Sequence, residues 1–404
     1  MIPKLLLVTV LCLGQATPST PVSLRFDKPS EAFAYANAPM AEWEADVKAG
    51  RPPKTGIAPK AEVQRRAKAL CPSFAVENVS EEELYWLAKL CASQPAIGLT
   101  AVQRYLEGSG GKHRPEAHLL LSEMQLRTTR SWASSWETLR TILQEDPIGS
   151  EPEVRVRVAI EEEANENEAT ALKWAEERYS ILLQRFRHPK TDVPSVYAGW
   201  VILAGADLTH RYYLARETDR AEDTLEEING LKAEAPDAIE AWPSDHLNWI
   251  NMEMKPAPAI PVLRPLGSNP GTDVVRLGRV ELVSFFFLHC APCLSELEDL
   301  NGFQKRYPKD KVLVVDVTTY KAALQPDAPP HKKVESAIER TRRKKSPHLA
   351  MAITTEQTLR DYGIRGFPTI GVIDKAGRLR YAGLSNGYDA GEDLDRLVRR
   401  LLDE

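Results

Sequence analysis

The sequence has little of several features that mark particular classes of protein. It contains five cysteines in 404 residues, too few for a disulfide-dense scaffold. Its 52 lysines and arginines are outnumbered by 57 aspartates and glutamates, which gives a formal net charge of −5. This balance argues against a nucleic-acid-binding protein, because phosphate contacts require a clustered excess of basic residues. Beyond the N-terminus, no stretch approaches the roughly 20 apolar residues that span a bilayer.

The remaining composition is that of a globular protein, and the N-terminus resembles an export signal. Hydrophobic residues make up 43% of the chain and charged residues 27%, and the length suggests two or three domains. Lys4 precedes an apolar run from Leu5 to Leu13, and small residues follow at Gly14 and Ala16. This pattern predicts a signal peptide over residues 1–16, although an apolar strand or helix of a cytosolic protein is the alternative. We therefore expect export to the periplasm or another extracytoplasmic compartment, with a soluble mature protein whose disulfides persist.

An all-α domain is expected from residue 17 to residue 253. Apolar residues recur there at helical intervals, as at Leu84, Leu87 and Leu90, and prolines at 95, 147, 189 and 236 follow helical stretches. The segment 213–222 loosely resembles a tetratricopeptide helix pair, but the spacing of the prolines exceeds that family's period of about 34 residues. The region is predicted to be helical-repeat-like, with an irregular helical bundle as the alternative.

A change of texture separates this region from the C-terminal part. Five prolines fall at positions 256, 258, 261, 265 and 270, and such stretches favour domain boundaries, so residues 254–270 are predicted to be a linker. From 271 to 404, strands expected at 280–287, 312–317, 349–353, 369–373 and 379–382 alternate with helices expected at 292–306, 331–345, 357–362 and 394–402. The pattern predicts an α/β domain with a mixed sheet flanked by helices.

The motif Cys290-Ala291-Pro292-Cys293 lies where the first of these strands gives way to a helix. Two sulfurs at this spacing close a small disulfide ring, and unpaired N–H groups at the helix start favour a thiolate. A thiolate at such a position has a pKa below the free value of about 8.5. Cys290 is then the attacking nucleophile, and Cys293, one turn into the helix, resolves the mixed disulfide.

Several segments of residues 271–404 resemble the thioredoxin superfamily, in particular the TlpA/ResA-like thiol–disulfide oxidoreductases. The matching pieces are Val283-Ser284-Phe285-Phe286, Cys290-Ala291-Pro292-Cys293, Glu296, Tyr362-Gly363-Ile364-Arg365-Gly366-Phe367-Pro368-Thr369 and Val372-Ile373-Asp374-Lys375-Ala376-Gly377-Arg378. The resemblance covers about a third of the chain and says nothing about the helical region.

The resemblance implies an activity and the residues that serve it. Pro368 matches the family's cis-proline, which faces the two cysteines and leaves the Phe367 backbone available for strand-like pairing with a polypeptide substrate. Glu296 matches a glutamate near the buried sulfur, where a carboxylate accepts the proton of the resolving thiol; a solvated helix residue is the alternative. Cysteine pairs of other exported proteins are the expected substrates. No dissociable cofactor is required, and similar proteins receive electrons from a membrane-bound thiol donor.

One position departs from the family pattern, which usually has tryptophan before the first cysteine. This sequence has His289 there. Its imidazolium would favour the Cys290 thiolate and contribute to the substrate surface, or the ring points into solvent and does neither. The direction of electron flow therefore stays open.

The cysteines and histidines allow other interpretations as well. Cys290, Cys293 and His289, supplemented by His331 and His348, are suitable ligands for copper(I) or zinc, although the proline motif favours redox chemistry. A protein-interaction scaffold, in which the helical region binds an unknown partner and the thioredoxin-like part is inert, is a further alternative. Cys71 and Cys91 are predicted to form a structural disulfide, with two separate buried thiols as the alternative.

Overall fold

The computed structural model describes residues 25–52, 58–108, 111–144, 150–188, 194–234, 242–267, 270–321, 331–384 and 390–404. The predicted signal peptide and the prolines at 147, 189 and 236 lie outside these ranges. The chain forms two compact units, residues 1–138 and 139–404. Within the described ranges, no helix is both long enough and apolar enough to cross a membrane.

The first unit is helical, and its elements are α1 (Pro29–Lys48), α2 (Lys60–Leu70), α3 (Glu81–Leu90), α4 (Pro95–Glu107) and α5 (Arg114–Thr129), with short 3₁₀ turns η1 (Cys71–Ser73) and η2 (Val76–Asn78). Leu84, Leu87 and Leu90 are buried in its core, as their helical spacing predicts. Pro95 begins α4, where the missing N–H costs nothing because a first-turn N–H has no helical partner. Helix α6 (Ala133–Gln144) spans the division between the units.

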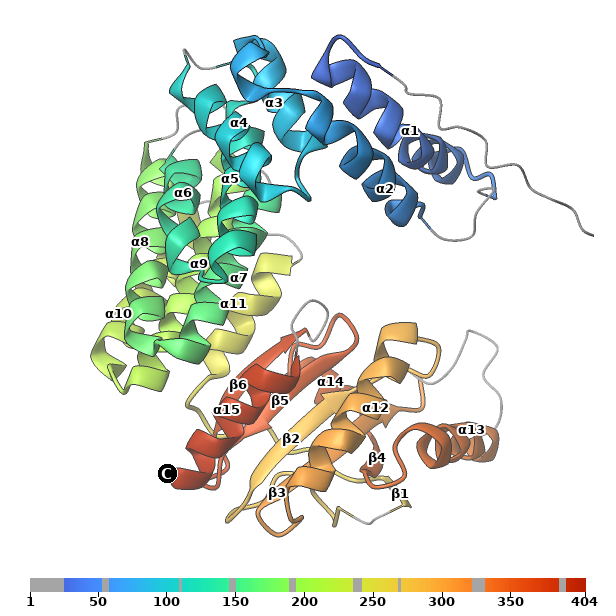
Figure 1. Cartoon of the computed structure of the whole chain (residues 1–404). Helices are drawn as coiled ribbons and strands as arrows, with labels where there is room; N and C mark the ends of the chain where they lie inside the picture. Colours follow the sequence, from blue (N-terminus) through green and yellow to red (C-terminus); the bar gives the residue numbers. More distant parts are fainter. Residues whose placement is uncertain are drawn as a thin grey trace, which may run out of the picture. The chain divides into compact units, whose positions relative to one another are not determined.

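The second unit begins with helices that pack consecutively, as α7 against α8, α8 against α9 and α9 against α10 (Figure 1). Their bounds are α7 (Ser150–Glu166), α8 (Glu168–Arg187), α9 (Pro194–Ala215), α10 (Thr218–Glu234) and α11 (Trp242–Met252). Helix α11 packs against α9 and also against the last strand of the sheet. The N-terminal half of the chain is therefore helical, as predicted.

The rest of the second unit is built on a mixed sheet with the strand order β1-β4-β3-β2-β5-β6. The strands are β1 (Arg264–Gly267), β2 (Val280–Phe285), β3 (Val312–Thr319), β4 (Ala350–Thr354), β5 (Thr369–Ile373) and β6 (Leu379–Leu384). Strands β2, β3 and β4 run parallel, whereas β1, β5 and β6 pair antiparallel with their neighbours. This is the mixed sheet that the sequence predicted.

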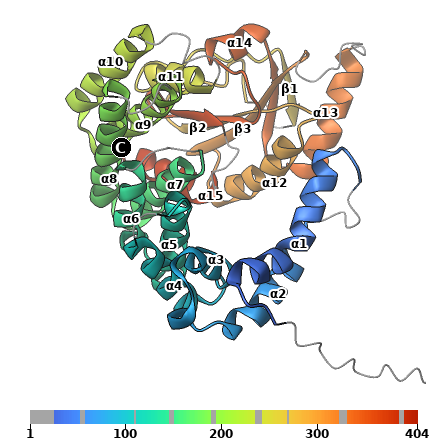
Figure 2. The same ribbon diagram turned by 90° about the horizontal axis from the view of Figure 1, so that it is seen from above.

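Helices cover both faces of the sheet (Figure 2). One face carries α12 (Ala291–Arg306), α13 (His331–Lys345) and α15 (Ala390–Asp403). The opposite face is covered by α14 (Glu356–Asp361) and by the chain between α11 and β2. Every residue of β2 and β3 is buried, which is typical of strands covered on both faces.

The proline-rich segment differs from the linker expected over residues 254–270. It contains β1, which pairs with β4 at the edge of the sheet, and its Ile260 is fully buried. The N–H groups of Met254 and Ala257 donate to the carbonyls of Leu379 and Gly377 at 2.7 and 2.9 Å. Prolines are tolerated there because an edge strand leaves half of its N–H groups without a ladder partner. The compact units accordingly divide between residues 138 and 139 and not at this segment.

Candidate active site

The two cysteines of the motif lie at the N-terminus of α12, directly after β2 and a short loop. Their sulfurs are joined in a disulfide. Cys290 is the N-cap residue, and its Sγ accepts a hydrogen bond from the Cys293 N–H at 3.1 Å. Pro292 occupies the first turn, where its fixed φ suits the helix. The sulfur of Cys290 therefore sits at the positive end of the helix dipole, where a negative charge is stabilised.

The two sulfurs differ in exposure. Cys290 is partly exposed, whereas Cys293 is fully buried in a cluster with Phe286 and Leu297. A substrate sulfur approaching from solvent meets Cys290 first. The predicted roles, an attacking Cys290 and a resolving Cys293, require this difference in exposure and stay predictions.

A second loop faces the disulfide from the start of β5. The Phe367–Pro368 peptide bond is cis, as the resemblance implied. The carbonyl oxygen of Phe367 lies 3.8 Å from the Cys290 Sγ. Thr369 holds this loop in a tight turn, since its hydroxyl donates to the Gly366 carbonyl at 2.9 Å. The loop thus presents backbone polar groups beside the exposed sulfur.

Glu296 is buried, with 7% of its surface exposed, so the alternative of a solvated helix residue is wrong. The Ser284 hydroxyl of β2 donates to Glu296 Oε1 at 2.7 Å. Glu296 follows Cys293 by three residues on α12, and residues at this spacing lie on the same side of a helix. The carboxyl therefore lies on the inner side of the helix, toward the buried sulfur.

His289 is exposed, so the structure favours the interpretation in which its ring points toward solvent. Its ring stands edge-on to Phe287 at a centroid distance of 5.7 Å. Phe287 in turn lies 6.1 Å from the ring of Phe367. These side chains form an aromatic rim, defined here as Phe287, His289 and Phe367, beside the disulfide.

One buried acid was missed by the sequence interpretation. Asp316 lies in the middle of β3 and is fully buried, on the strand next to Ser284. The sequence does contain a feature that points to it, because this aspartate interrupts the apolar run 312–317 that is predicted to be a buried strand. A buried carboxyl in such a run requires a partner or a function.

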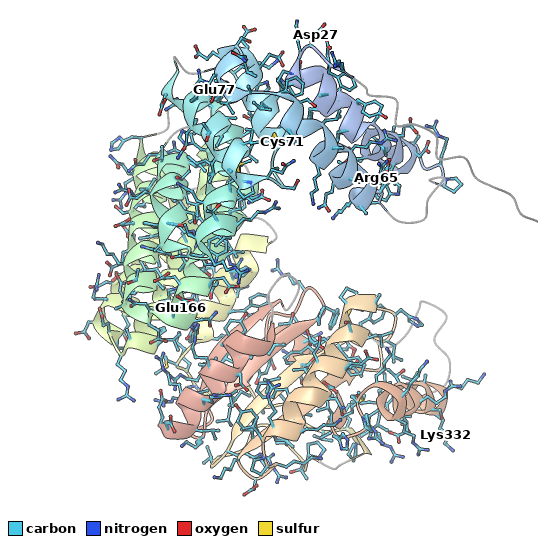
Figure 3. All side chains as sticks on the ribbon, viewed as in Figure 1. Asp27, Arg65, Cys71, Glu77, Glu166 and Lys332 are labelled. Atoms are coloured by element: carbon cyan, nitrogen blue, oxygen red, sulfur yellow. A yellow bond between two sulfur atoms is a disulfide. The ribbon has the colours of Figure 1, made fainter. Side chains whose placement is uncertain are left out.

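The second pair of cysteines is also bridged. Cys71, labelled in Figure 3, follows α2, and Cys91 follows α3. They form a disulfide 20 residues apart in sequence, and both are fully buried in the core of the first unit. Complete burial suits a structural bridge and keeps these sulfurs away from substrates.

A cavity of about 120 Å³ lies in the second unit among α7, α9, α11, β6 and α15. Its charged groups are paired: Asp207 with Arg178 at 2.7 Å, Arg211 with Glu161 at 2.9 Å and His210 with Glu253 at 2.7 Å. Burial alone would lower the pKa of His210, but the Glu253 carboxylate outweighs it and raises the pKa. Because each acid has its base, these residues are best understood as an ion-pair network that joins the helices.

Of the residues proposed as metal ligands, Cys290 and Cys293 are joined to each other in the disulfide. His348 is exposed, and the side chain of His331 lies outside the described residues. No group of three histidine, cysteine, aspartate or glutamate side chains suited to a metal ion occurs among the residues that the structure describes.

Neither a protein-family model nor a curated protein matches the chain, but solved structures are similar to its C-terminal part. A thioredoxin-like superfamily protein, SPOA0173, is 20% identical, with 37% of this chain and 97% of the other covered and a TM-score of 0.32. A thiol-disulfide isomerase from Corynebacterium glutamicum is 18% identical with the same coverage and a TM-score of 0.31. A thioredoxin-like protein from Porphyromonas gingivalis is 17% identical, with 37% and 92% covered and a TM-score of 0.29.

The order and directions of the strands, with α12 directly after β2, give the C-terminal part the thioredoxin-like fold that the sequence predicted. The similarity concerns the fold alone, and any activity depends on the site. Its elements are the mixed sheet, the disulfide at the start of α12 and the cis-proline that precedes β5.

Proposed function

We propose that this protein is a thiol–disulfide oxidoreductase that exchanges disulfides with cysteine pairs of other proteins. One observation carries the proposal: a partly exposed sulfur caps a helix N-terminus, is bridged to a buried sulfur one turn later and lies 3.8 Å from the Phe367 carbonyl oxygen. A structural disulfide needs neither the helix tip nor the facing backbone. The helix N-terminus stabilises a sulfur that leaves as a thiolate, and the facing backbone can bind a peptide substrate.

The exchange proceeds in two displacements when the reduced protein reduces a substrate. The Cys290 thiolate attacks one sulfur of the substrate disulfide, which forms a mixed disulfide and releases the other sulfur as a thiolate that takes a proton from water. Cys293 then gives up its proton and attacks the Cys290 sulfur, which releases the second substrate thiolate. Two electrons pass to the substrate, and the protein ends with the Cys290–Cys293 disulfide. Oxidation of a dithiol is the same sequence reversed.

The helix and the buried acid lower the barriers of these two displacements. The N–H of Cys293 already points at the Cys290 sulfur, so the charge on that sulfur is stabilised without rearrangement. Glu296 is proposed to accept the Cys293 proton in the second displacement. Its Ser284 hydrogen bond holds the carboxyl in place on the side of α12 that faces the inner sulfur.

The surroundings of Cys290 suit an extended polypeptide with apolar side chains near its cysteine. The Phe367 carbonyl offers an acceptor for the substrate backbone, in the manner of strand pairing. The aromatic rim offers apolar area beside it, with an exposed imidazole at its edge. His289 is accordingly proposed to contact substrate rather than to act on the sulfur.

Location and partners are proposed from the sequence. The signal-like N-terminus and the buried second disulfide support an exported protein that acts in an oxidising compartment such as the periplasm. Its substrates are then other exported proteins. A membrane-bound thiol donor is proposed to return the disulfide to the dithiol, the helical region is proposed to bind a protein partner, and the exchange itself requires no dissociable cofactor.

Reduction of insulin by dithiothreitol tests the proposal. The wild-type protein should accelerate the reaction, and Cys290→Ser should abolish the acceleration. A Cys71→Ala/Cys91→Ala variant is the matched control, because it removes the other disulfide and should retain the activity. Equal rates for the wild type and Cys290→Ser would overturn the proposal. A reduction potential of the Cys290–Cys293 pair below about −300 mV would indicate a structural bridge and favour an interaction scaffold.

A further inference from the structure

A second carboxyl group is buried under the helix that carries the disulfide. Asp316 of β3 is fully buried, and neither of its carboxyl oxygens has a hydrogen-bond partner among the residues that the structure describes. Leaving a buried polar group unpaired costs about 1–3 kcal/mol, and a charged one costs more. A carboxyl group that stays unpaired in the core, on the strand beside the one that leads to Cys290, requires an explanation.

The position of Asp316 on the sheet directs it toward α12. Val312 and Val314 pack with Leu300 and Phe303 of α12, and alternate residues of a strand share a face. Asp316 continues that series. Its register partner on β2 is Ser284, whose hydroxyl binds Glu296 on α12. Asp316 and Glu296 therefore reach the same buried space, one from the sheet and one from the helix.

Electrostatics agrees with this placement. Burial is the main cause that raises the pKa of Asp316 well above its usual value, and the nearby Glu296 carboxyl raises it further. The other elements around this space present apolar groups: Met351 and Ile353 from β4, and Val334 and Ile338 from α13. No ion pair with Asp316 occurs in the part of the chain that the structure describes.

The opposite face of the sheet shows how this fold compensates a buried carboxylate. Glu281 of β2 is also fully buried. Its oxygens accept a charged hydrogen bond from Arg279 at 2.8 Å and a backbone hydrogen bond from Arg276 at 2.9 Å. Asp316 has no such partners and has another acid nearby instead. Two facing carboxyls in an apolar space cannot both be ionised, so they hold a proton in common.

We propose that Asp316 is a positioning residue for the redox reaction: it forms with Glu296 a buried acid pair that carries one proton and one negative charge at neutral pH. This proposal rests on the proposed function. When Cys293 attacks, its S–H proton passes to the charged carboxylate of the pair, and its electron pair forms the bond to the Cys290 sulfur. The bond from Cys290 to the substrate breaks, and the substrate leaves as a thiolate. The pair then holds two protons and returns one to solvent.

The two acids have different tasks in this scheme. Glu296 is held by Ser284 on the inner side of α12 and exchanges the proton. Asp316 acts through Glu296, because its presence determines how strongly that carboxylate attracts a proton. If both acids were ionised, their charges would repel each other, so the pair keeps its shared proton to a higher pH than a single carboxyl would.

The test uses the full-length, pre-reduced protein in single turnovers with insulin, quenched with an alkylating agent so that the mixed disulfide on Cys290 is counted. The rate of its resolution is measured from about pH 5 to pH 9. Asp316→Asn keeps the size of the side chain and removes the acid, and Glu281→Gln is the matched control for loss of a buried carboxyl on the other face. Far-ultraviolet circular dichroism checks that each variant is folded.

Asp316→Asn should move the inflection of the pH profile to lower pH by at least about one unit. Glu296→Gln should slow resolution at pH 7 by about tenfold or more, and the double variant should match Glu296→Gln within about twofold, because Asp316 acts only through Glu296. Glu281→Gln should leave the inflection in place. A profile of Asp316→Asn that superimposes on the wild type, or independent losses in the double variant, would overturn the proposal.

Infrared spectroscopy of the oxidised protein provides a readout that does not depend on turnover. A protonated carboxyl absorbs apart from a carboxylate, so the wild-type-minus-variant spectrum at pH 7 should contain a protonated carboxyl band for Asp316→Asn. If insulin is not reduced but the band is present, the proposed function fails and the acid pair stands. If insulin is reduced and the band is absent, the acid pair fails alone.

Discussion

Removal of residues 1–270 is expected to unfold the thioredoxin-like part, although the fragment 271–404 keeps five of the six strands and both cysteines of the site. Within the described ranges, six backbone hydrogen bonds join residues 254–263 to the chain that the fragment retains. They are Met254 N to Leu379 O, Ala257 N to Gly377 O, Val262 N to Thr272 O, Leu263 N to Ile353 O, Val274 N to Ile260 O and Leu379 N to Lys255 O.

The loss can be set against the stability of an ordinary domain. At about 1 kcal/mol net for each hydrogen bond, and about 2 kcal/mol for burial of Ile260, deletion removes about 8 kcal/mol. The pairing of β1 with β4 is lost in addition. Natural domains have unfolding free energies of about 5–15 kcal/mol. The fragment is therefore expected to be largely unfolded at 25 °C.

Three fragments separate the contributions: residues 139–404, which form the compact second unit, residues 254–404 and residues 271–404. Urea unfolding followed by near- and far-ultraviolet circular dichroism measures each one. The first should unfold cooperatively, the second should be less stable because it lacks α11, and the third should show no cooperative transition. If the 271–404 fragment had the same urea midpoint as 139–404, residues 254–270 would contribute nothing to stability and would be a simple linker after all.

Three further outcomes are expected. Cys71→Ala/Cys91→Ala should lower the unfolding free energy by about 3 kcal/mol, the loop entropy for this spacing, with a difference that disappears when urea unfolding is repeated in dithiothreitol. Burial lowers the pKa of His246 to about 4, so between pH 6.5 and 4 the unfolded state binds more protons than the folded state. As the pH is lowered from 6.5 to 4, the unfolding free energy should therefore fall by up to about 3 kcal/mol. His246→Gln should flatten that pH dependence. Trp249→Phe removes the donor to the Tyr362 carbonyl at 3.0 Å. Because this leaves a buried carbonyl without a partner, which costs more than the net contribution of the hydrogen bond, the variant should lose about 2 kcal/mol in urea unfolding, whereas no change would show that water replaces the indole.

The strands after residue 271 were predictable, because burial on both faces of a sheet produces continuous apolar runs in the sequence. The segments 331–345 and 369–373 match α13 and β5 without error, and the other predicted elements differ from the observed ones by a few residues at their ends. The cysteine motif could be recognised equally well, since its spacing and its place between a strand and a helix are local properties of the sequence.

Long-range contacts explain what the sequence could not supply. Proline content indicated a linker at 254–270, but pairing with β4 depends on residues nearly 90 positions away. The burial of Glu296 likewise depends on Ser284 from the preceding strand, whereas spacing alone left it open. Asp316 stands out in the sequence as an acid within an apolar run, but its proximity to Glu296 depends on the register of β2 and β3.

Tyr362 connects the helices of the second unit to the redox site. Its carbonyl accepts the Trp249 indole N–H of α11, and its ring packs against Phe285 at the end of β2 at 5.1 Å. The chain from Phe285 leads directly to Cys290, and the chain from Tyr362 leads to Phe367, so both sides of the site converge on this buried tyrosine. A shift of α11 would therefore change the distance between the Cys290 sulfur and the Phe367 carbonyl oxygen. Any such coupling is limited by the contacts that transmit it, of which the indole hydrogen bond contributes about 1 kcal/mol.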